Sequence, residues 1–450
     1  MNEAKFPEHF LWGCATSSYQ IEGATTRHGR HPSIWDTFCA YPGKVADGAT
    51  GDVACDHYNR MEEDVALMKQ LGIDIYRFSI SWPRVLTMDG ALNRQGIEFY
   101  KRLLATLKRN GIKACATLFH WDLPQHLQDI GGWMNREVVA KFVNYAEKMF
   151  RELDDDVHQW ITINEPSVIS VLGYINGIHA PGIRDLKKAM RVSHHLMVAH
   201  ALAVRKYREL GLTGEIGITL NFNHYEPYDK DNPNDVVVSN RMDALWNRQY
   251  LDLLFRARYP EDLLAWLAEK DAVPEMEEGD LQLISEKIDF LGVNYYSRNK
   301  QKYDPEQDGI LETYTRNDAD ANVNALNWEI YPEGLYHEIV RVHEQYRQLP
   351  VYITENGGAF TDDVLSRDGQ IHDRQRIDYL QSHFAEAKKM IDDGVDLRGY
   401  YVWSLLDNFE WHMGYGPRFG LFYVDYDSQA RIWKDSAKWY KAFIRAQKGN

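Results

Sequence analysis

The chain alternates between two kinds of segment, and this alternation constrains its fold more than any other feature. Apolar residues recur at helical spacing over 62–71, and Gly72 separates them from an apolar run at 73–80 that is typical of a β-strand. The same order returns along the chain. The pattern predicts strands at 11–19, 73–80, 112–119, 157–163, 214–221, 288–295, 351–354 and 395–405. It predicts helices over 62–71, 97–107, 142–153, 186–210, a segment ending near 286, 333–347 and 376–393.

Eight strands that alternate with helices indicate an α/β protein. The strands are apolar enough for burial on both faces, which favours a closed parallel barrel over an open sheet. The length of 450 residues suits such a barrel with long loops after the strands. Since no linker rich in Pro, Gly or Ser divides the chain, we expect a single (β/α)8 TIM barrel domain over residues 1–450.

Two of the expected strands end on a glutamate. Glu165 follows the fourth strand and precedes Pro166, which has no N–H to continue a strand ladder. Glu355 ends the seventh strand, and Gly357 then allows a turn. Because the carboxyl ends of barrel strands form the active face, we expect the two side chains to converge. Paired carboxylates at such a place indicate acid–base or nucleophilic chemistry.

The charge balance narrows the choice of partner. Lys and Arg number 51 against 66 Asp and Glu, so the net charge is −15. Nucleic acid and anionic membranes would be repelled, which favours a neutral small-molecule substrate. Aromatic residues make up 13% of the chain, enough to form flat platforms of the kind that bind sugars. Whether the protein forms a homo-oligomer is left open.

Neither cysteines nor histidines are spaced for a metal. The four cysteines show no C-x-x-C pair, and reduced thiols in a cytoplasm are expected. His194, His195 and His200 share one predicted helix, but their spacing does not converge on one ion. We therefore expect no metal and no cofactor. The first ten residues lack the apolar stretch of a secretion signal, and the whole chain lacks an 18-residue apolar run, so we expect a cytoplasmic protein.

Four stretches of the chain together resemble glycoside hydrolase family 1, the β-glucosidase type of retaining glycosidase. They are FLWGCATSSYQIEGA at 10–24, NEP at 164–166, YITENG at 352–357 and WSLLDNFEW at 403–411. They occur in the order of the family and span nearly the whole chain. The resemblance implies that Glu355 is the nucleophile and Glu165 the acid of a double displacement. Such a mechanism requires the two carboxyl groups about 5–5.5 Å apart.

The resemblance also implies a set of supporting residues. Arg77 and Tyr296 would be partners of the nucleophile that favour its charged form, and the charge on Glu355 should raise the pKa of Glu165. Asn294 and Trp328 would support the wall of the same cleft, and Trp403 would be the platform beneath the sugar. The hydroxyl-binding set would be Gln20, His120, Trp121, Asn164, Glu410 and Trp411.

The function implied is that of a β-glucosidase acting on terminal non-reducing glucosyl residues of β-glucosides and cello-oligosaccharides, with β-galactosidase or β-fucosidase side activity. The Glu410 carboxylate would repel a phosphate, which disfavours 6-phospho-glycosides, and the presence of Glu165 disfavours a thioglucosidase. Two alternatives remain: a transglycosylase using the same residues, and a non-catalytic sugar-binding barrel. Val168, Leu172, Asn223, His224 and the loop 298–327 are expected to surround the leaving group.

Overall fold

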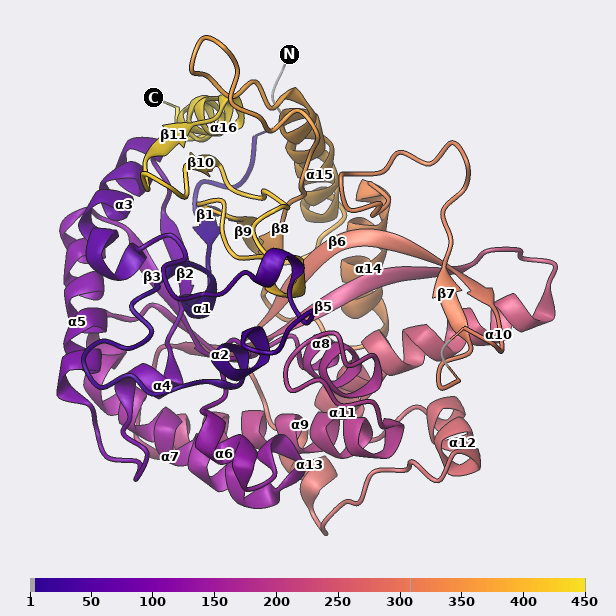
Figure 1. The fold of residues 1–450 in the computed structure, drawn as a ribbon. Coiled ribbons are helices and arrows are strands. Elements are labelled where there is room, and N and C mark those ends of the chain that lie inside the picture. The colour runs from indigo at the N-terminus through magenta and orange to yellow at the C-terminus, as the bar shows by residue number, and fades with distance from the viewer. Residues whose placement is uncertain (1–4, 308, 450) are drawn as a thin grey trace.

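A computed structural model describes residues 5–307 and 309–449, and its centre is a closed barrel of parallel strands (Figure 1). The barrel order is β5-β4-β3-β2-β1-β9-β8-β6, and β6 pairs in parallel with β5 to close it. The predicted (β/α)8 barrel is thus confirmed. Its strands are β1 (Leu11–Ala15), β2 (Ile75–Ser79), β3 (Lys113–Phe119), β4 (Gln159–Asn164), β5 (Glu215–Pro227), β6 (Phe290–Tyr303), β8 (Val351–Asn356) and β9 (Leu397–Trp403).

Helices surround the barrel, and short strands lie outside it. The long helices between barrel strands are α3 (His57–Leu71), α5 (Arg94–Arg109), α7 (Arg136–Leu153), α9 (Leu186–Glu209), α14 (Pro332–Gln345) and α15 (Arg374–Asp392). Loop and terminal helices are α1 (Ser18–Ile21), α2 (Ile34–Cys39), α4 (Trp82–Val85), α6 (Gln125–Asp129), α8 (Pro166–Ser170), α10 (Pro233–Asp243), α11 (Gln249–Arg256), α12 (Glu261–Glu269), α13 (Asp280–Ile284) and α16 (Asp435–Gln447). The outlying strands are β7 (Thr313–Thr315), β10 (Phe422–Val424) and β11 (Arg431–Trp433).

Glycine stops α3 as its position in the sequence predicts. Gly72 has a φ of 85°, and its N–H donates to the carbonyl of Met68 at 3.1 Å. Glycine adopts this left-handed conformation without the steric cost of a Cβ, so the chain leaves the helix and turns towards β2.

Three strand boundaries differ from the sequence prediction by more than two residues. The expected first strand over 11–19 ends at Ala15, and Ser18–Ile21 forms the short helix α1. The expected fifth strand, 214–221, continues to Pro227, and the expected sixth, 288–295, continues to Tyr303. The physical reason is mutual pairing: β5 and β6 remain hydrogen-bonded as far as Pro227 and Gln301, and β7 pairs antiparallel with the far end of β6. Figure 1 shows these strands leaving the barrel together.

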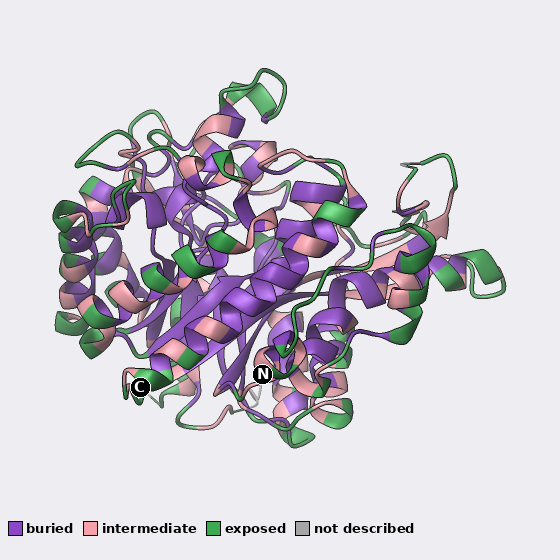
Figure 2. Cartoon of the chain, turned by 90° about the horizontal axis from the view of Figure 1, so that it is seen from below, coloured by how far each residue is buried: buried purple, intermediate pink, exposed green. Residues whose placement is uncertain are grey.

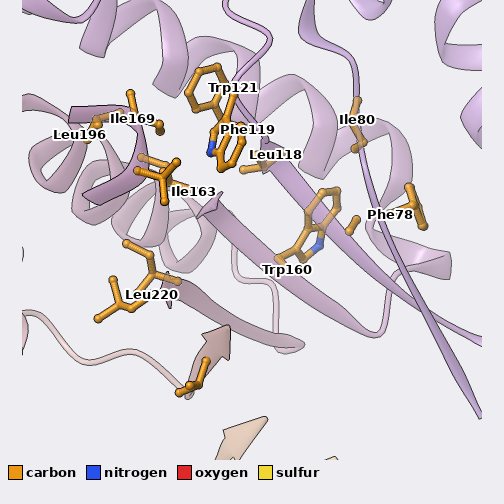
Figure 3. Packing of buried hydrophobic residues seen from close by; sticks show 14 of the residues in the cluster. Phe78, Ile80, Leu118, Phe119, Trp121, Trp160, Ile163, Ile169, Leu196 and Leu220 are labelled. Atoms are coloured by element: carbon orange, nitrogen blue, oxygen red, sulfur yellow. The ribbon is translucent and has the colours of Figure 1, made fainter. Parts of the chain in front are cut away.

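Two clusters of buried side chains form the core: a large one with residues of the strands and of the surrounding helices, and a smaller one that includes Ile75, Ile161 and Tyr401 of β2, β4 and β9. Figure 2 shows that the barrel strands are largely buried. On one side of the barrel, Phe119, Ile163 and Leu220 follow one another on β3, β4 and β5 (Figure 3). Ile169 of α8 and Leu196 of α9 pack from outside into the same cluster. Removing so much apolar surface from water fixes the strand ends in place.

Two further properties of the described residues are the state of the cysteines and the character of the helices. The four cysteines are free thiols buried in the interior: Cys14, Cys39, Cys55 and Cys115. A search of the described helices finds none with both the length and the apolar character needed to cross a membrane.

Candidate active site

A cavity of about 370 Å³ opens at the carboxyl ends of the barrel strands, and both Glu165 and Glu355 line it. Glu165 directly follows β4, and Glu355 is the last residue but one of β8. Each residue is 3% exposed. The barrel therefore brings together the two glutamates that the sequence singles out.

The backbone of Glu165 is held in an unusual conformation. Its φ of 53° and ψ of 66° lie in the left-handed region, which residues other than glycine rarely adopt. Its N–H donates to the carbonyl of Thr219 on β5 at 2.9 Å, and Pro166 then begins α8. Proline is well tolerated at the first position of a helix. The strand thus ends at Asn164, and the turn directs the Glu165 side chain into the cavity.

Neutral amides surround the Glu165 carboxyl group. Its Oε1 atom accepts a hydrogen bond from Asn294 at 2.7 Å and another from Asn221 at 2.9 Å. The indole N–H of Trp246 in turn donates to the Asn221 carbonyl oxygen at 3.1 Å, which fixes which end of that amide faces the glutamate. Asn294, Asn221 and Trp246 all lack a positive charge.

The Glu355 carboxyl group has a cation and a hydroxyl as partners. Arg77 donates to its Oε1 and Tyr296 to its Oε2, each at 2.6 Å. Arg77 also donates to the side-chain oxygen of Asn164 at 2.6 Å, and Asn294 donates to the same oxygen at 3.1 Å. Because Asn294 also contacts Glu165, one continuous hydrogen-bond network joins the two carboxyl groups.

Burial affects the proton affinity of both glutamates. Burial first, and the Glu355 charge second, raise the pKa of Glu165 to about 8. Burial also raises the pKa of Glu355, although Arg77 and the hydrogen bond from Tyr296 lower it. Arg77 and Tyr296 favour the charged form of Glu355 as expected from the sequence, but the cost of placing a carboxylate out of water outweighs them. Of the two glutamates, Arg77 contacts only Glu355. When the pair holds one proton, the charge therefore resides on Glu355 and the proton on Glu165.

A third carboxyl group, Glu410, lines the same cavity. Burial, followed by the charges of Glu355 and Glu165, raises its pKa to about 8. At neutral pH Glu410 is therefore mainly protonated, and the expected repulsion of a phosphate by this residue is weak. Another feature disfavours an anionic substrate: the described residues that line the cavity include neither lysine nor arginine.

Aromatic rings form one wall of the cavity. The His120 ring lies nearly parallel to those of Trp403 and Trp411, with centroids 6.1 and 6.0 Å away. The Asn164 amide N–H lies 3.2 Å from His120 Nε2 and donates to it, so the ring proton is on Nδ1. Burial and the nearby Arg77 charge keep the pKa of His120 well below its usual value, so the ring is neutral.

The remaining predicted residues are divided between the cavity surface and the layer behind it. Trp328 lines the cavity and packs against Tyr296, with 5.7 Å between ring centroids. Trp121 also lines it, but its indole N–H donates to the backbone carbonyl of Asn164 at 3.0 Å and is not directed at a ligand. Arg77, Asn164 and Asn294 lie behind the surface, where Arg77 and Asn294 contact the glutamates and Asn164 contacts Arg77.

Gln20 is not among the residues that line the cavity. Its amide nitrogen donates to Asn408 at 3.0 Å and to the carbonyl of Phe409 at 2.7 Å, and its oxygen accepts from Ser17 at 2.6 Å. Its location in α1, and not in a strand, explains the difference, because the helix turns the side chain towards the loop after β9.

Sequence reasoning missed Asn221, which contacts Glu165 directly. A signal was available, since Asn221 is the last residue of the expected fifth strand and thus occupies the same level of the barrel as the two glutamates. Its partner Trp246 could not be found this way, because it lies in a loop helix far from any strand end.

The three histidines of α9 form hydrogen bonds within the fold. His194 contacts Tyr259 at 3.0 Å and Asp280 at 2.8 Å, while His200 contacts Thr162 at 2.7 Å. His195 contacts the carbonyl of Trp133 at 2.8 Å. Across residues 5–307 and 309–449, no group of three or more His, Cys, Asp or Glu side chains is arranged to hold a metal ion.

Comparisons with known proteins agree with this geometry. The chain is 48% identical over 447 residues to "Beta-glucosidase A" of Thermotoga maritima, covering 99% of each protein. It is 42% identical over 458 residues to a "Bifunctional beta-D-glucosidase/beta-D-fucosidase" of Bifidobacterium breve, covering 98% of each. The crystal structure of the GH1 β-glucosidase from Exiguobacterium antarcticum B7 superposes with a TM-score of 0.95 at 45% identity, covering 99% of both chains.

The family model described as "Glycosyl hydrolase family 1" matches residues 2–449, which is nearly the full length of the chain. The barrel, the paired glutamates at the ends of β4 and β8, and this match all lead to one assignment: the chain belongs to glycosyl hydrolase family 1.

Proposed function

We propose that the protein is a retaining β-glucosidase that releases terminal β-D-glucosyl residues from the non-reducing end of small glycosides. The observation that supports this most directly is the network between Glu165 and Glu355, in which only Glu355 has a cationic partner. It gives one carboxyl group the charge of a nucleophile and the other the proton of an acid. The names of the relatives from Thermotoga maritima and Bifidobacterium breve support the choice of glucoside.

In the first step, a carboxylate oxygen of Glu355 attacks the anomeric carbon. The bond from that carbon to the leaving oxygen breaks, and the proton of Glu165 passes to the leaving oxygen. The result is a covalent glucosyl ester on Glu355 and a free leaving group. Arg77 and Tyr296 hold the attacking carboxylate in place through both of its oxygens.

In the second step, Glu165 acts as a base. Ester formation removes the charge of Glu355, which is one of the two causes of the raised pKa of Glu165. Glu165 has lost its proton and can now accept one from water, whose oxygen attacks the anomeric carbon. The bond from that carbon to the Glu355 oxygen breaks, which releases glucose and restores the Glu355 carboxylate. Two displacements at one carbon leave its configuration unchanged.

The wall of the cavity supports recognition of a neutral sugar. His120 presents its Nδ1 proton, for which the described protein provides no acceptor, and protonated Glu410 can both donate and accept. Trp403 supplies an apolar ring surface of the kind on which a pyranose stacks. Side activity on β-fucosides is supported by the activity named for the Bifidobacterium breve relative, and β-galactosides are proposed as a further substrate.

The test is replacement of the nucleophile, Glu355→Ala, assayed on 4-nitrophenyl β-glucoside. Activity is expected to fall by about 10⁴-fold or more, because no glucosyl ester can form. Azide should restore turnover by occupying the vacated space, and its product should be the α-glucosyl azide, since a single displacement inverts the carbon. Near wild-type activity without azide would refute the assignment.

Glu338→Ala is a suitable comparison for that experiment. Glu338 is also a buried glutamate, but it lies on α14 and does not line the cavity. Its replacement should not create dependence on azide. Transfer of the glucosyl group to a second sugar uses the same intermediate, and product analysis at high acceptor concentration would reveal it.

A further inference from the structure

The loop that follows β9 carries Glu410, Trp411, His412 and Met413 in succession, and all four line the active-site cavity. Trp411 has a φ of 51°, in the left-handed region that residues with a Cβ rarely adopt. For a residue as bulky as tryptophan this conformation costs free energy, and it persists only where the surroundings hold it. The contacts that hold Trp411 therefore also determine where its neighbour Glu410 faces.

Backbone hydrogen bonds close residues 410–414 into a tight turn. The N–H of Glu410 donates to the carbonyl of Gly414 at 2.8 Å, and the N–H of Gly414 donates to the carbonyl of Trp411 at 3.1 Å. The N–H of Met413 donates to the carbonyl of Glu410 at 3.0 Å. Because all three bonds lie within the turn, they set its shape and not its position in the cavity wall.

Aromatic rings pack around the Trp411 side chain. The centroids of the Trp35 and Trp121 rings each lie 4.6 Å from that of Trp411. The Tyr19 ring is nearly parallel to it at 6.1 Å. Such contacts are favourable over a range of ring offsets and tilts, whereas a hydrogen bond loses strength quickly as its angle changes. The rings thus keep Trp411 in the wall without fixing its direction sharply.

A side-chain hydrogen bond links the turn to the loop between α8 and α9. His412 Nδ1 lies 3.1 Å from Nε2 of His179 in that loop. Burial lowers the pKa of both rings, so both are neutral at neutral pH. A neutral imidazole has one N–H and one acceptor nitrogen, so one ring can donate to the other.

His179 is itself firmly held. It is 6% exposed, and its backbone N–H donates to the carbonyl of Leu172 at 3.1 Å. Its ring packs edge-on against Trp35, with 5.2 Å between centroids, and lies 5.6 Å from the ring of Trp121. His179 therefore gives the turn a fixed point of attachment.

We propose that His179 and His412 are positioning residues: the hydrogen bond between their rings holds the turn 410–414 so that Glu410 and Trp411 face the glucosyl ring of the substrate. The inference rests on the proposed function and identifies what orients its sugar-binding side chains. Loss of one neutral hydrogen bond corresponds to a fall of about two- to tenfold in kcat/KM.

Variants of His412 test the bond atom by atom. The amide of asparagine places a polar atom near the position of Nδ1, which makes the bond, whereas the longer amide of glutamine corresponds to Nε2. His412→Leu and His412→Gln are each expected to lower kcat/KM for cellobiose about fivefold, and His412→Asn should stay within about twofold of the wild type. Equal values for the Asn and Gln variants, or wild-type activity in His412→Leu, would overturn the proposal.

The order of the amides reverses at His179, because this residue uses Nε2. His179→Gln should therefore retain more activity than His179→Asn. The double variant with leucine at both positions should lose less than the product of the two single losses, since each single change already breaks the same bond. Losses that multiply would overturn the proposal.

A role in positioning is separated from a loss of folded protein by counting active sites. The burst of dinitrophenolate from 2,4-dinitrophenyl 2-deoxy-2-fluoro-β-glucoside gives that count, and all rates are expressed per active site. The fall in kcat/KM should be the same for cellobiose and for 2,4-dinitrophenyl β-glucoside, because both carry the same glucosyl ring. A fall confined to cellobiose would place the effect on the acid Glu165 and overturn the proposal.

His372→Leu is the matched control. His372 is exposed, contacts Asp368 and Asp435, and is not among the residues that line the cavity, so its replacement should leave kcat/KM as in the wild type. Failure of this inference is distinguishable from failure of the proposed function. In the first case the His412 variants do not differ while Glu355→Ala remains inactive without azide. In the second case Glu355→Ala retains activity.

Discussion

The two glutamates of the active site differ at the scale of single residues in the charge of their neighbours. Glu355 accepts from Arg77 and Tyr296, whereas Glu165 accepts only from the amides of Asn221 and Asn294. Two buried carboxyl groups joined by one network will not both ionise readily. The contact with Arg77 determines which one holds the charge, and this asymmetry leads to two predictions about Glu165.

Removal of the acid should affect substrates according to their leaving groups. In Glu165→Ala, kcat/KM for cellobiose is expected to fall by about 10²–10⁴-fold, because its leaving oxygen must be protonated as the bond breaks. The fall in kcat/KM for a 2,4-dinitrophenyl β-glucoside should be much smaller, since that leaving group departs as an anion and needs no proton. Parallel assays of the two substrates check this. Equal losses on both would show that Glu165 is not the acid.

The raised pKa of Glu165 predicts the alkaline limb of the pH profile. Glu165 must be protonated to act as acid, and its pKa is about 8, so kcat/KM for cellobiose should fall as the pH rises through about 8. Glu355 must be ionised, and burial raises its pKa above that of an ordinary glutamate, so the acidic limb should lie at a higher pH than an ordinary glutamate would give. A pH series of initial rates measures both limbs.

Glu410 must be distinguished from Glu165 in that series, since its pKa is also about 8. The variant Glu410→Gln, assayed on cellobiose, should retain the alkaline limb. Loss of the limb in this variant would assign it to Glu410.

At the scale of elements, Arg376 of α15 connects the loops that follow β8 and β9. Its guanidinium group donates to the carbonyls of Gly358 at 2.5 Å and Phe419 at 3.1 Å, and it pairs with Asp363 and Asp373. Phe419 lines the cavity. A single helix residue, 1% exposed, thus holds two active-site loops together.

Loss of this residue should therefore cost stability. Arg376→Leu is expected to lower the free energy of unfolding by about 3–5 kcal/mol, because it leaves the buried carboxylates with one partner fewer. Arg376→Lys retains the charge but has fewer hydrogen-bond donors, and its free energy of unfolding should fall by a smaller amount. Urea unfolding followed by tryptophan fluorescence measures both variants. A loss below about 1 kcal/mol for Arg376→Leu would contradict the role described.

The extension of β5 and β6 is a second feature at this scale. Their sequences outside the barrel alternate between residues that face the cavity and residues that do not, but they contain too many polar residues for a strand prediction based on burial. Pairing with one another and with β7 keeps them extended. Loop 298–327 was expected to shape the entrance, and part of it does so as regular strand.

At the scale of the whole molecule, barrel closure is what creates the site. Arg77, Asn164, Asn294 and Glu355 come from β2, β4, β6 and β8, of which β6 and β8 are neighbours, and closure of the barrel brings the four side chains together. That the chain forms one domain, and that it has no metal or cofactor, remain predictions from the sequence. So does the absence of nucleic acid and membrane partners.

The sequence by itself determined the order of strands and helices, the closed barrel, and the location of Glu165 and Glu355 at strand ends. These follow from local patterns, such as apolar periodicity and the effects of Gly72 and Pro166, which act over a few residues. Only the tertiary structure decided the distances between segments far apart in the chain. It placed Gln20 against Asn408 and Phe409, outside the cavity, and it brought Asn221 to Glu165. It also decided the pKa of Glu165, because burial is a property of everything packed around a group and not of its neighbours in sequence.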